Sequence, residues 1–150
     1  MRRGLVRIAT ASALALSLLA TGATMAPTAH ATTLRRERML AWVNHARAEH
    51  GAKKLVMNDA VVRLAHKHNL EMARKRSLFH TSDLGYKLRY VDWHTWGENV
   101  GAGVDPYGLY KAYMASPDHR ANILDKRFDH VGISFVVRDG IMWSTMIFYG

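Results

Sequence analysis

The stretch that decides the fold class is residues 131–149, VGISFVVRDGIMWSTMIFY. In its first half, Val131, Ile133 and Phe135 alternate with smaller or polar residues, which is the period of a half-buried β-strand. Asp139-Gly140 is a typical two-residue hairpin turn. The residues after it are again mostly apolar, so the chain returns as a partner strand. We predict an antiparallel hairpin that forms part of a central sheet.

Two helices are predicted well before this hairpin. Thr32-Thr33 can cap the first, and Gly51 ends it as a left-handed stop. Asn58 is the predicted N-cap of the second, which ends at the basic residues 74–76, where cations stabilise a helix. The apolar positions follow the helical spacing in both segments: Met39, Trp42, Val43 and Ala46, then Val61, Leu64, Ala65, His68 and Met72.

Residues 77–104 show no clear period, so we expect irregular structure with room for a short helix. A third helix is predicted from Asp105-Pro106 to Met114, and a new one starts at Ser116-Pro117, with proline at the first helical position. Helices therefore come first and the hairpin last. This order predicts an α+β fold with helices packed on an antiparallel sheet.

The first 31 residues are typical of a secretory signal peptide. Three arginines at positions 2, 3 and 7 precede an apolar run over residues 8–20, which is short for a membrane span. Ala29-His30-Ala31 follows as a small-residue cleavage site. We expect removal of residues 1–31 and a single secreted domain over residues 32–150; an uncleaved N-terminal anchor is the alternative.

Charge and cysteine content limit the function classes. Loss of the three arginines would lower Lys+Arg from 21 to 18 against 12 Asp+Glu, so the formal charge falls from +9 to +6. This balance favours weak anionic partners or simply maintains solubility. No basic run is long enough for a nucleic-acid arm, so we expect no nucleic-acid partner. Without cysteine, disulfides, thiol catalysis and Cys-ligated zinc are excluded.

Three polar residues are candidates for a site. His119 is predicted in the first turn of a helix, where the dipole disfavours imidazolium and leaves a lone pair for a metal or a proton. Glu98 lies in a glycine-rich segment, as a structural acceptor of N–H groups or as a catalytic carboxylate. His80 is predicted on a loop after the second helix. For both histidines a plain surface or backbone-bonding role is the alternative.

Other chemistry has less support. The His-Glu-x-x-His metal motif, the Gly-x-Ser-x-Gly nucleophile motif and a phosphate-cradling glycine loop are absent. Ser116 lies close to His119, but as an N-cap its hydroxyl would bond to backbone N–H groups, which argues against a serine nucleophile. His68 lies on the apolar stripe of the second helix and is expected to be a satisfied, buried or half-buried side chain.

Several of these motifs together resemble the bacterial branch of the CAP superfamily, also called the SCP domain. The matching segments are FHT at 79–81, GENVGAG at 97–103 and YMASPDHRANIL at 113–124, within a resemblance from about Leu40 to the C-terminus. The resemblance implies a three-layer α-β-α sandwich around a central antiparallel sheet. It also implies a cleft lined by His80, Glu98 and His119. The fourth acidic position of the family has no match, since residues 110–116 contain no acid.

The resemblance implies a secreted binding protein without a demonstrated reaction. Its cleft would hold a ligand or a divalent metal such as Zn, with His80 and His119 as metal ligands. The resemblance implies a lipid as partner, whereas the positive charge favours an anionic cell-wall or surface polymer, whose binding would need no cleft. The alternative is a metal-assisted extracellular hydrolase that uses both histidines and Glu98. In either case we expect the two imidazoles to lie about 4–5 Å apart, measured between ring nitrogens.

Overall fold

The computed structural model describes residues 29–150, so the predicted signal peptide lies almost entirely outside the described residues. Within this part, no helix has both the length and the apolar character needed to span a membrane. The elements, in chain order, are α1 (Ala29–Glu49), β1 (Val56–Met57), α2 (Asp59–Lys75), α3 (Leu84–Lys87), β2 (Trp96–Gly103), α4 (Pro106–Ala115), α5 (Pro117–Leu124), β3 (His130–Arg138) and β4 (Ile141–Tyr149).

The predicted C-terminal hairpin is confirmed. Strands β3 and β4 pair antiparallel, and the turn residues Asp139 and Gly140 both have positive φ, at 52° and 74°. Strand β2 adds antiparallel to β4, and the sheet order is β1-β3-β4-β2. The short β1 pairs parallel to β3. The prediction of a purely antiparallel sheet is therefore wrong, because a two-residue strand is too short to show a period in the sequence.

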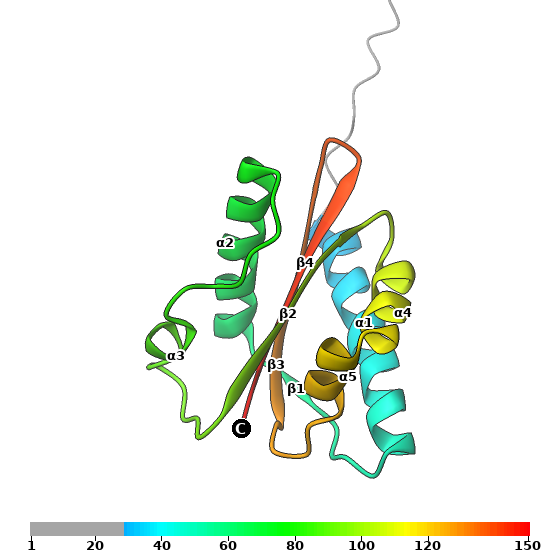
Figure 1. Ribbon diagram of the computed structural model, residues 1–150, viewed down its shortest axis with the longest axis vertical. Helices are drawn as coiled ribbons and strands as arrows, with labels where there is room; N and C mark the ends of the chain where they lie inside the picture. Colours follow the sequence, from blue (N-terminus) through cyan, green and yellow to red (C-terminus); the bar gives the residue numbers. More distant parts are fainter. Residues whose placement is uncertain (1–28) are drawn as a thin grey trace, which may run out of the picture.

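Helices cover both faces of this sheet. Helix α2 lies over one face, while α1, α4 and α5 lie over the other (Figure 1). The alternation along β4 explains the division: Met146 and Phe148 pack with α1, α4 and α5, whereas Ile147 and Tyr149 pack with α2 and α3. Both sides of the sheet are thus apolar and buried, which is why β4 reads as an almost continuous apolar run.

The helix ends are set largely as predicted. The Asn58 side chain accepts from two N–H groups of the first turn of α2, and Gly51 after α1 has φ of +66°. Helix α1, however, already includes Ala29, the first described residue, and Thr33 donates its hydroxyl to the Ala29 carbonyl at 3.1 Å instead of capping. Ser116 occupies the N-cap position of α5 but forms no side-chain capping bond, so the capping argument against a serine nucleophile is wrong.

Strand β2 is the main difference from the predicted irregular segment 77–104, in which the short helix α3 also lies. The glycines of β2 do not have positive φ; they allow close packing instead. A Cβ on Gly97 would lie 2.8 Å from Asn122 Oδ1, and one on Gly101 would lie 2.8 Å from the Tyr113 hydroxyl. These glycines let α4 and α5 approach β2, and Glu98 lies on this strand and not on a loop.

Candidate functional site

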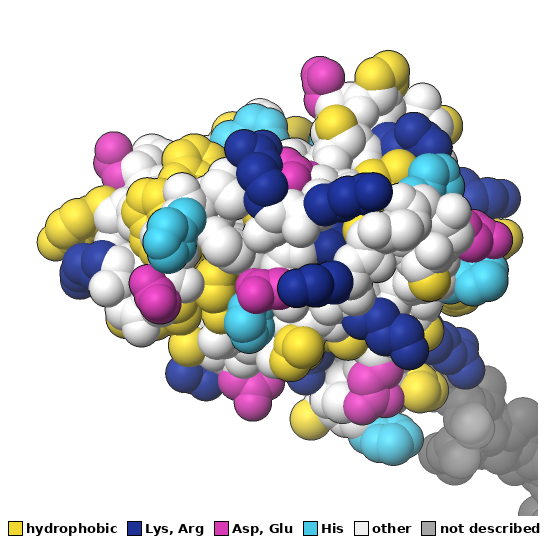
Figure 2. All heavy atoms as spheres, turned by 90° about the horizontal axis from the view of Figure 1, so that it is seen from below, with side chains coloured by type: hydrophobic (Ala, Val, Ile, Leu, Met, Phe, Trp, Pro, Cys, Tyr) yellow, Lys and Arg dark blue, Asp and Glu magenta, His cyan; other side chains and the backbone are white. Residues whose placement is uncertain are grey.

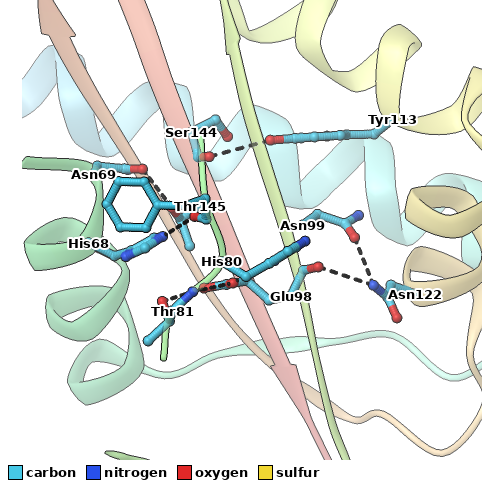
Figure 3. Close-up of polar contacts among 11 residues, drawn as sticks. His68, Asn69, His80, Thr81, Glu98, Asn99, Tyr113, Asn122, Ser144 and Thr145 are labelled. Atoms are coloured by element: carbon cyan, nitrogen blue, oxygen red, sulfur yellow. Dashed lines mark hydrogen bonds and ion pairs between the residues drawn. The ribbon is translucent and has the colours of Figure 1, made fainter. Parts of the chain in front are cut away.

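A cluster of three residues joins the segment after α2 to strand β2. Glu98 Oε2 accepts from His80 Nδ1 at 2.8 Å and from the Thr81 backbone N–H at 2.9 Å. Its second oxygen, Oε1, accepts from the Thr81 hydroxyl at 2.5 Å. Figure 3 shows the three side chains together beside β2. Two of the predicted site residues, His80 and Glu98, are therefore in direct contact.

The two partners differ sharply in burial. The Glu98 side chain is only 3% exposed, whereas that of His80 is 66% exposed. A carboxylate buried this deeply needs hydrogen-bond donors, and its three bonds supply them. Because an ionised carboxylate only accepts, His80 Nδ1 must carry the proton. The other ring nitrogen, Nε2, lies away from this bond on an exposed ring, so it can meet a ligand.

His119 lies in the first turn of α5, as predicted, and is half-buried. Its ring meets the Tyr113 ring edge-on, with centroids 5.1 Å apart. Burial lowers the pKa of His119, the charge of His80 lowers it further, and Asp118 opposes both. The neutral form is therefore favoured, as expected, and burial is the largest of these three contributions.

Two asparagines, the buried Asn99 and the half-buried Asn122, connect α5 to β2 beside this cluster. Asn122 Nδ2 donates to Asn99 Oδ1 at 2.9 Å and to the Glu98 carbonyl at 3.2 Å. Asn99 Nδ2 in turn donates to the His119 carbonyl at 2.9 Å. The sequence reasoning missed these residues, although both lie inside the quoted motifs. They place the first turn of α5 against the strand that carries Glu98.

The exposed side of the cluster forms a shallow hollow of about 420 Å³. Trp96, 44% exposed, and Asn122 line this hollow with His80, Thr81, Gly97 and Glu98. His119 is not among the lining residues, although it is near enough for the charge of His80 to affect its pKa. The predicted separation of about 4–5 Å between the two imidazoles therefore stays a prediction.

The side-chain atoms available as metal ligands do not favour a site with three protein ligands. Both Glu98 oxygens already accept hydrogen bonds. Across residues 29–150, no three His, Asp or Glu side chains are grouped so that one ion could contact them all. A weaker site built on His80 Nε2 and His119 stays a prediction.

Comparison with known proteins places these motifs in one family. The model of the cysteine-rich secretory protein family (CAP) matches residues 40–147. A curated relative, the uncharacterised protein YkwD of Bacillus subtilis, is 28% identical over 116 residues. That alignment covers 72% of this chain but only 44% of YkwD, so the chain spans less than half the length of this relative.

Solved structures agree on the fold. A cysteine-rich secretory protein of Staphylococcus aureus superposes with a TM-score of 0.68 at 27% identity, covering 82% of this chain and 40% of that one. An extracellular SCP-domain protein of Bacillus anthracis superposes with a TM-score of 0.70 at 23% identity, over 79% of this chain and 41% of that one. An outer surface protein of Borrelia burgdorferi superposes with a TM-score of 0.71 at 16% identity, over 77% of this chain and 92% of that one. The last two support the fold alone. The family match covers most of the chain, including every site motif, and the chain belongs to the CAP family of cysteine-rich secretory proteins.

Proposed function

We propose that this protein is an extracellular binding domain that holds its ligand in the hollow around His80. One observation carries the proposal: an exposed imidazole is held by a buried carboxylate that makes three hydrogen bonds. Burying a carboxylate costs free energy unless it is fully bonded. Here that buried group fixes the orientation of a ring whose free nitrogen is open to solvent, which suits recognition of a ligand.

The chemistry of the hollow favours binding over catalysis. His80 Nε2 offers one lone pair, and Trp96 adds an apolar surface. The Thr81 hydroxyl donates to Glu98, and this bond helps to satisfy the buried carboxylate. The alternative hydrolase would need a water molecule as nucleophile and a cation or N–H pair for the developing negative charge. His119, whose pKa is lowered, would be a poor source of that positive charge.

Export is part of the same proposal. The relatives from Bacillus anthracis and Borrelia burgdorferi are described as extracellular and outer surface proteins, and the first 31 residues have the order of a signal peptide. The three-layer α-β-α arrangement of the family would then be the exported scaffold. N-terminal sequencing of protein from the culture medium should start at Thr32. Intact Met1 in a membrane fraction would point to an anchored protein instead.

Metal binding at the hollow is tested with zinc alone. We expect isothermal titration to show weak Zn²⁺ binding that is lost in both His80→Ala and His119→Ala, because each would supply one of only two protein ligands. His45→Ala is the control, since His45 is a highly exposed residue of α1. Elemental analysis of protein purified without chelator gives the occupancy. Unchanged zinc affinity in His80→Ala would refute a metal in this hollow.

The ligand itself is sought by native mass spectrometry of protein recovered from culture medium. We expect a co-purifying small molecule on the wild-type protein and on His45→Ala, but not on His80→Ala. Hydrolysis of a chromogenic ester that needs His80 would favour the alternative. Equal retention of the molecule by all three proteins would place its binding site elsewhere.

A further inference from the structure

A larger hollow lies beside helix α2, outside the His80 site. Its volume is about 600 Å³, and its walls are α2, the segment that leads into α3, and α3 itself. The polar residues that line it are Lys67, His68, Glu71, Arg74, Thr81, Ser82 and Lys87. We call this hollow the α2 groove. Apart from Thr81, which it shares with the His80 site, its polar residues lie outside the family motifs.

The α2 groove is positively charged. Three cations, Lys67, Arg74 and Lys87, face a single carboxylate, Glu71. That carboxylate already forms an ion pair with Lys75, with 3.2 Å between Nζ and Oε1, and the hydrogen bond from Lys75 lowers the Glu71 pKa. Glu71 therefore stays ionised but has a cation of its own. The cations of the groove are left to meet a negative charge from outside.

The groove continues along the helix. A neighbouring hollow of about 400 Å³ shares Leu64 and Lys67 with it and adds Arg63. Residues 63, 67 and 74 therefore put basic side chains along one side of α2, over about 16 Å at 1.5 Å per residue. A row of cations in a groove suits an extended chain with repeated charges better than it suits a single small ion.

We propose that the α2 groove binds a linear phosphodiester polymer. Two non-bridging oxygens on each phosphate match the planar fork of Arg63 and Arg74. Lys67 and Lys87 supply point charges, and the Ser82 hydroxyl lies at the wall as a further donor. A phosphodiester chain carries one charge per repeat, which the row of cations can neutralise stepwise.

The proposal rests on the row of cations in the groove and not on the overall charge of the protein. On the end of the molecule seen in Figure 2, Lys and Arg side chains are interspersed with acidic and histidine side chains, so no broad surface of one sign covers that end. The α2 groove also does not depend on His80. Thr81 lines both hollows, so a polymer in the groove would pass next to the His80 site.

The test compares two variants that each remove two positive charges. In Lys67→Gln/Arg74→Gln the cations of the groove are removed, whereas Lys53→Gln/Lys54→Gln removes exposed lysines before β1. Affinity for fluorescent poly(glycerol phosphate) is measured between about 50 and 200 mM salt, the range over which phosphate contacts weaken steeply. Thermal melting confirms that both variants are folded.

We expect the groove variant to bind on the order of tenfold more weakly than the wild type, and the control to bind nearly as well. The slope of log K against log salt should also become shallower in the groove variant, by about 0.7 for each phosphate that is no longer neutralised. Equal weakening in both variants would mean binding by diffuse charge and would overturn the proposal. So would no wild-type binding, or stronger binding to phosphatidylglycerol vesicles or polyglutamate than to the polymer.

Discussion

Glu98 shows how a buried charge can serve a surface site. Its carboxylate accepts three hydrogen bonds while its side chain is almost fully enclosed. In Glu98→Gln, one oxygen becomes an NH₂ group that faces donors from residues 80 and 81. We expect a loss of about 1–3 kcal/mol in unfolding free energy, because buried donors lose their acceptor.

Urea unfolding measures this loss. Glu71→Gln is the control, because Glu71 is an exposed carboxylate whose ion pair with Lys75 lies on the helix surface. That change should leave the unfolding free energy close to that of the wild type. If both variants lose the same amount, Glu98 is not the bonded, buried group that we describe.

His119 makes stability depend on pH in a defined direction. Its folded pKa is lowered from the ordinary value of 6.5, chiefly by burial, so the unfolded chain binds the proton more readily. Its contribution to stability is therefore full above the unfolded pKa. As pH falls below that value the contribution declines, until the folded pKa is passed.

The variant His119→Gln removes this group while it keeps the backbone carbonyl that Asn99 binds. We expect the wild type to lose more unfolding free energy than the variant between about pH 7.5 and about pH 5. Urea unfolding at both pH values gives the two differences. Parallel pH profiles for the two proteins would contradict a lowered His119 pKa.

At the scale of single residues, the sequence predicted part of the site. The motifs led to His80, Glu98 and His119, and the first two are in contact. The sequence did not reveal the bonding of Thr81 or of the two asparagines. Their roles depend on contacts between residues 17 to 24 positions apart, and no periodicity in a sequence reports such contacts.

At the scale of elements, the glycines of β2 determine how near the helices come. Gly101→Ala would put a methyl group 2.8 Å from the Tyr113 hydroxyl and 3.1 Å from its ring. We expect a loss of about 1–3 kcal/mol through overpacking. Because the closest contact is to the hydroxyl, the loss should be smaller when Tyr113→Phe is also present.

Gly140→Ala is the matched control for this double-mutant cycle. Its φ is +74° and a Cβ there meets nothing within 4 Å, so its cost comes from backbone strain alone. We expect that cost to be the same with Tyr113 or Phe at position 113. If Tyr113→Phe changed the cost of Gly101→Ala and of Gly140→Ala by the same amount, Gly101 would not act through contact with Tyr113.

The elements also show which patterns could be read from sequence. The hairpin and the capped start of α2 were predicted because their signals are local: a turn dipeptide and an N-cap side chain. Strand β2 was missed because three glycines in eight residues look like a loop. Only the neighbouring helices α4 and α5 explain why small residues are needed there, and that is tertiary information.

At the scale of the whole molecule, Arg47 links α1 to a segment far along the chain. This fully buried guanidinium donates to the carbonyls of Lys53, Ile123, Asp125 and Phe128, at 2.6 to 2.9 Å. In Arg47→Met these carbonyls lose their donor. We expect a loss of at least about 3 kcal/mol in unfolding free energy.

Arg38→Met is the control, because Arg38 is an exposed residue of the same helix. It should change the unfolding free energy by no more than about 0.5 kcal/mol. A similar small loss for Arg47→Met would mean that water or a rearranged loop replaces the guanidinium. The link between α1 and the segment before β3 would then be dispensable.

The central claim is that Glu98 fixes His80 with Nδ1 protonated and Nε2 free for a ligand. The most direct test is ¹⁵N NMR of the His80 imidazole, at a pH where the ring is neutral. We predict the Nδ1–H tautomer in the wild type and its loss in Glu98→Gln. If the wild-type ring instead showed the Nε2–H tautomer, or a mixture that Glu98→Gln left unchanged, the account of the site would be wrong.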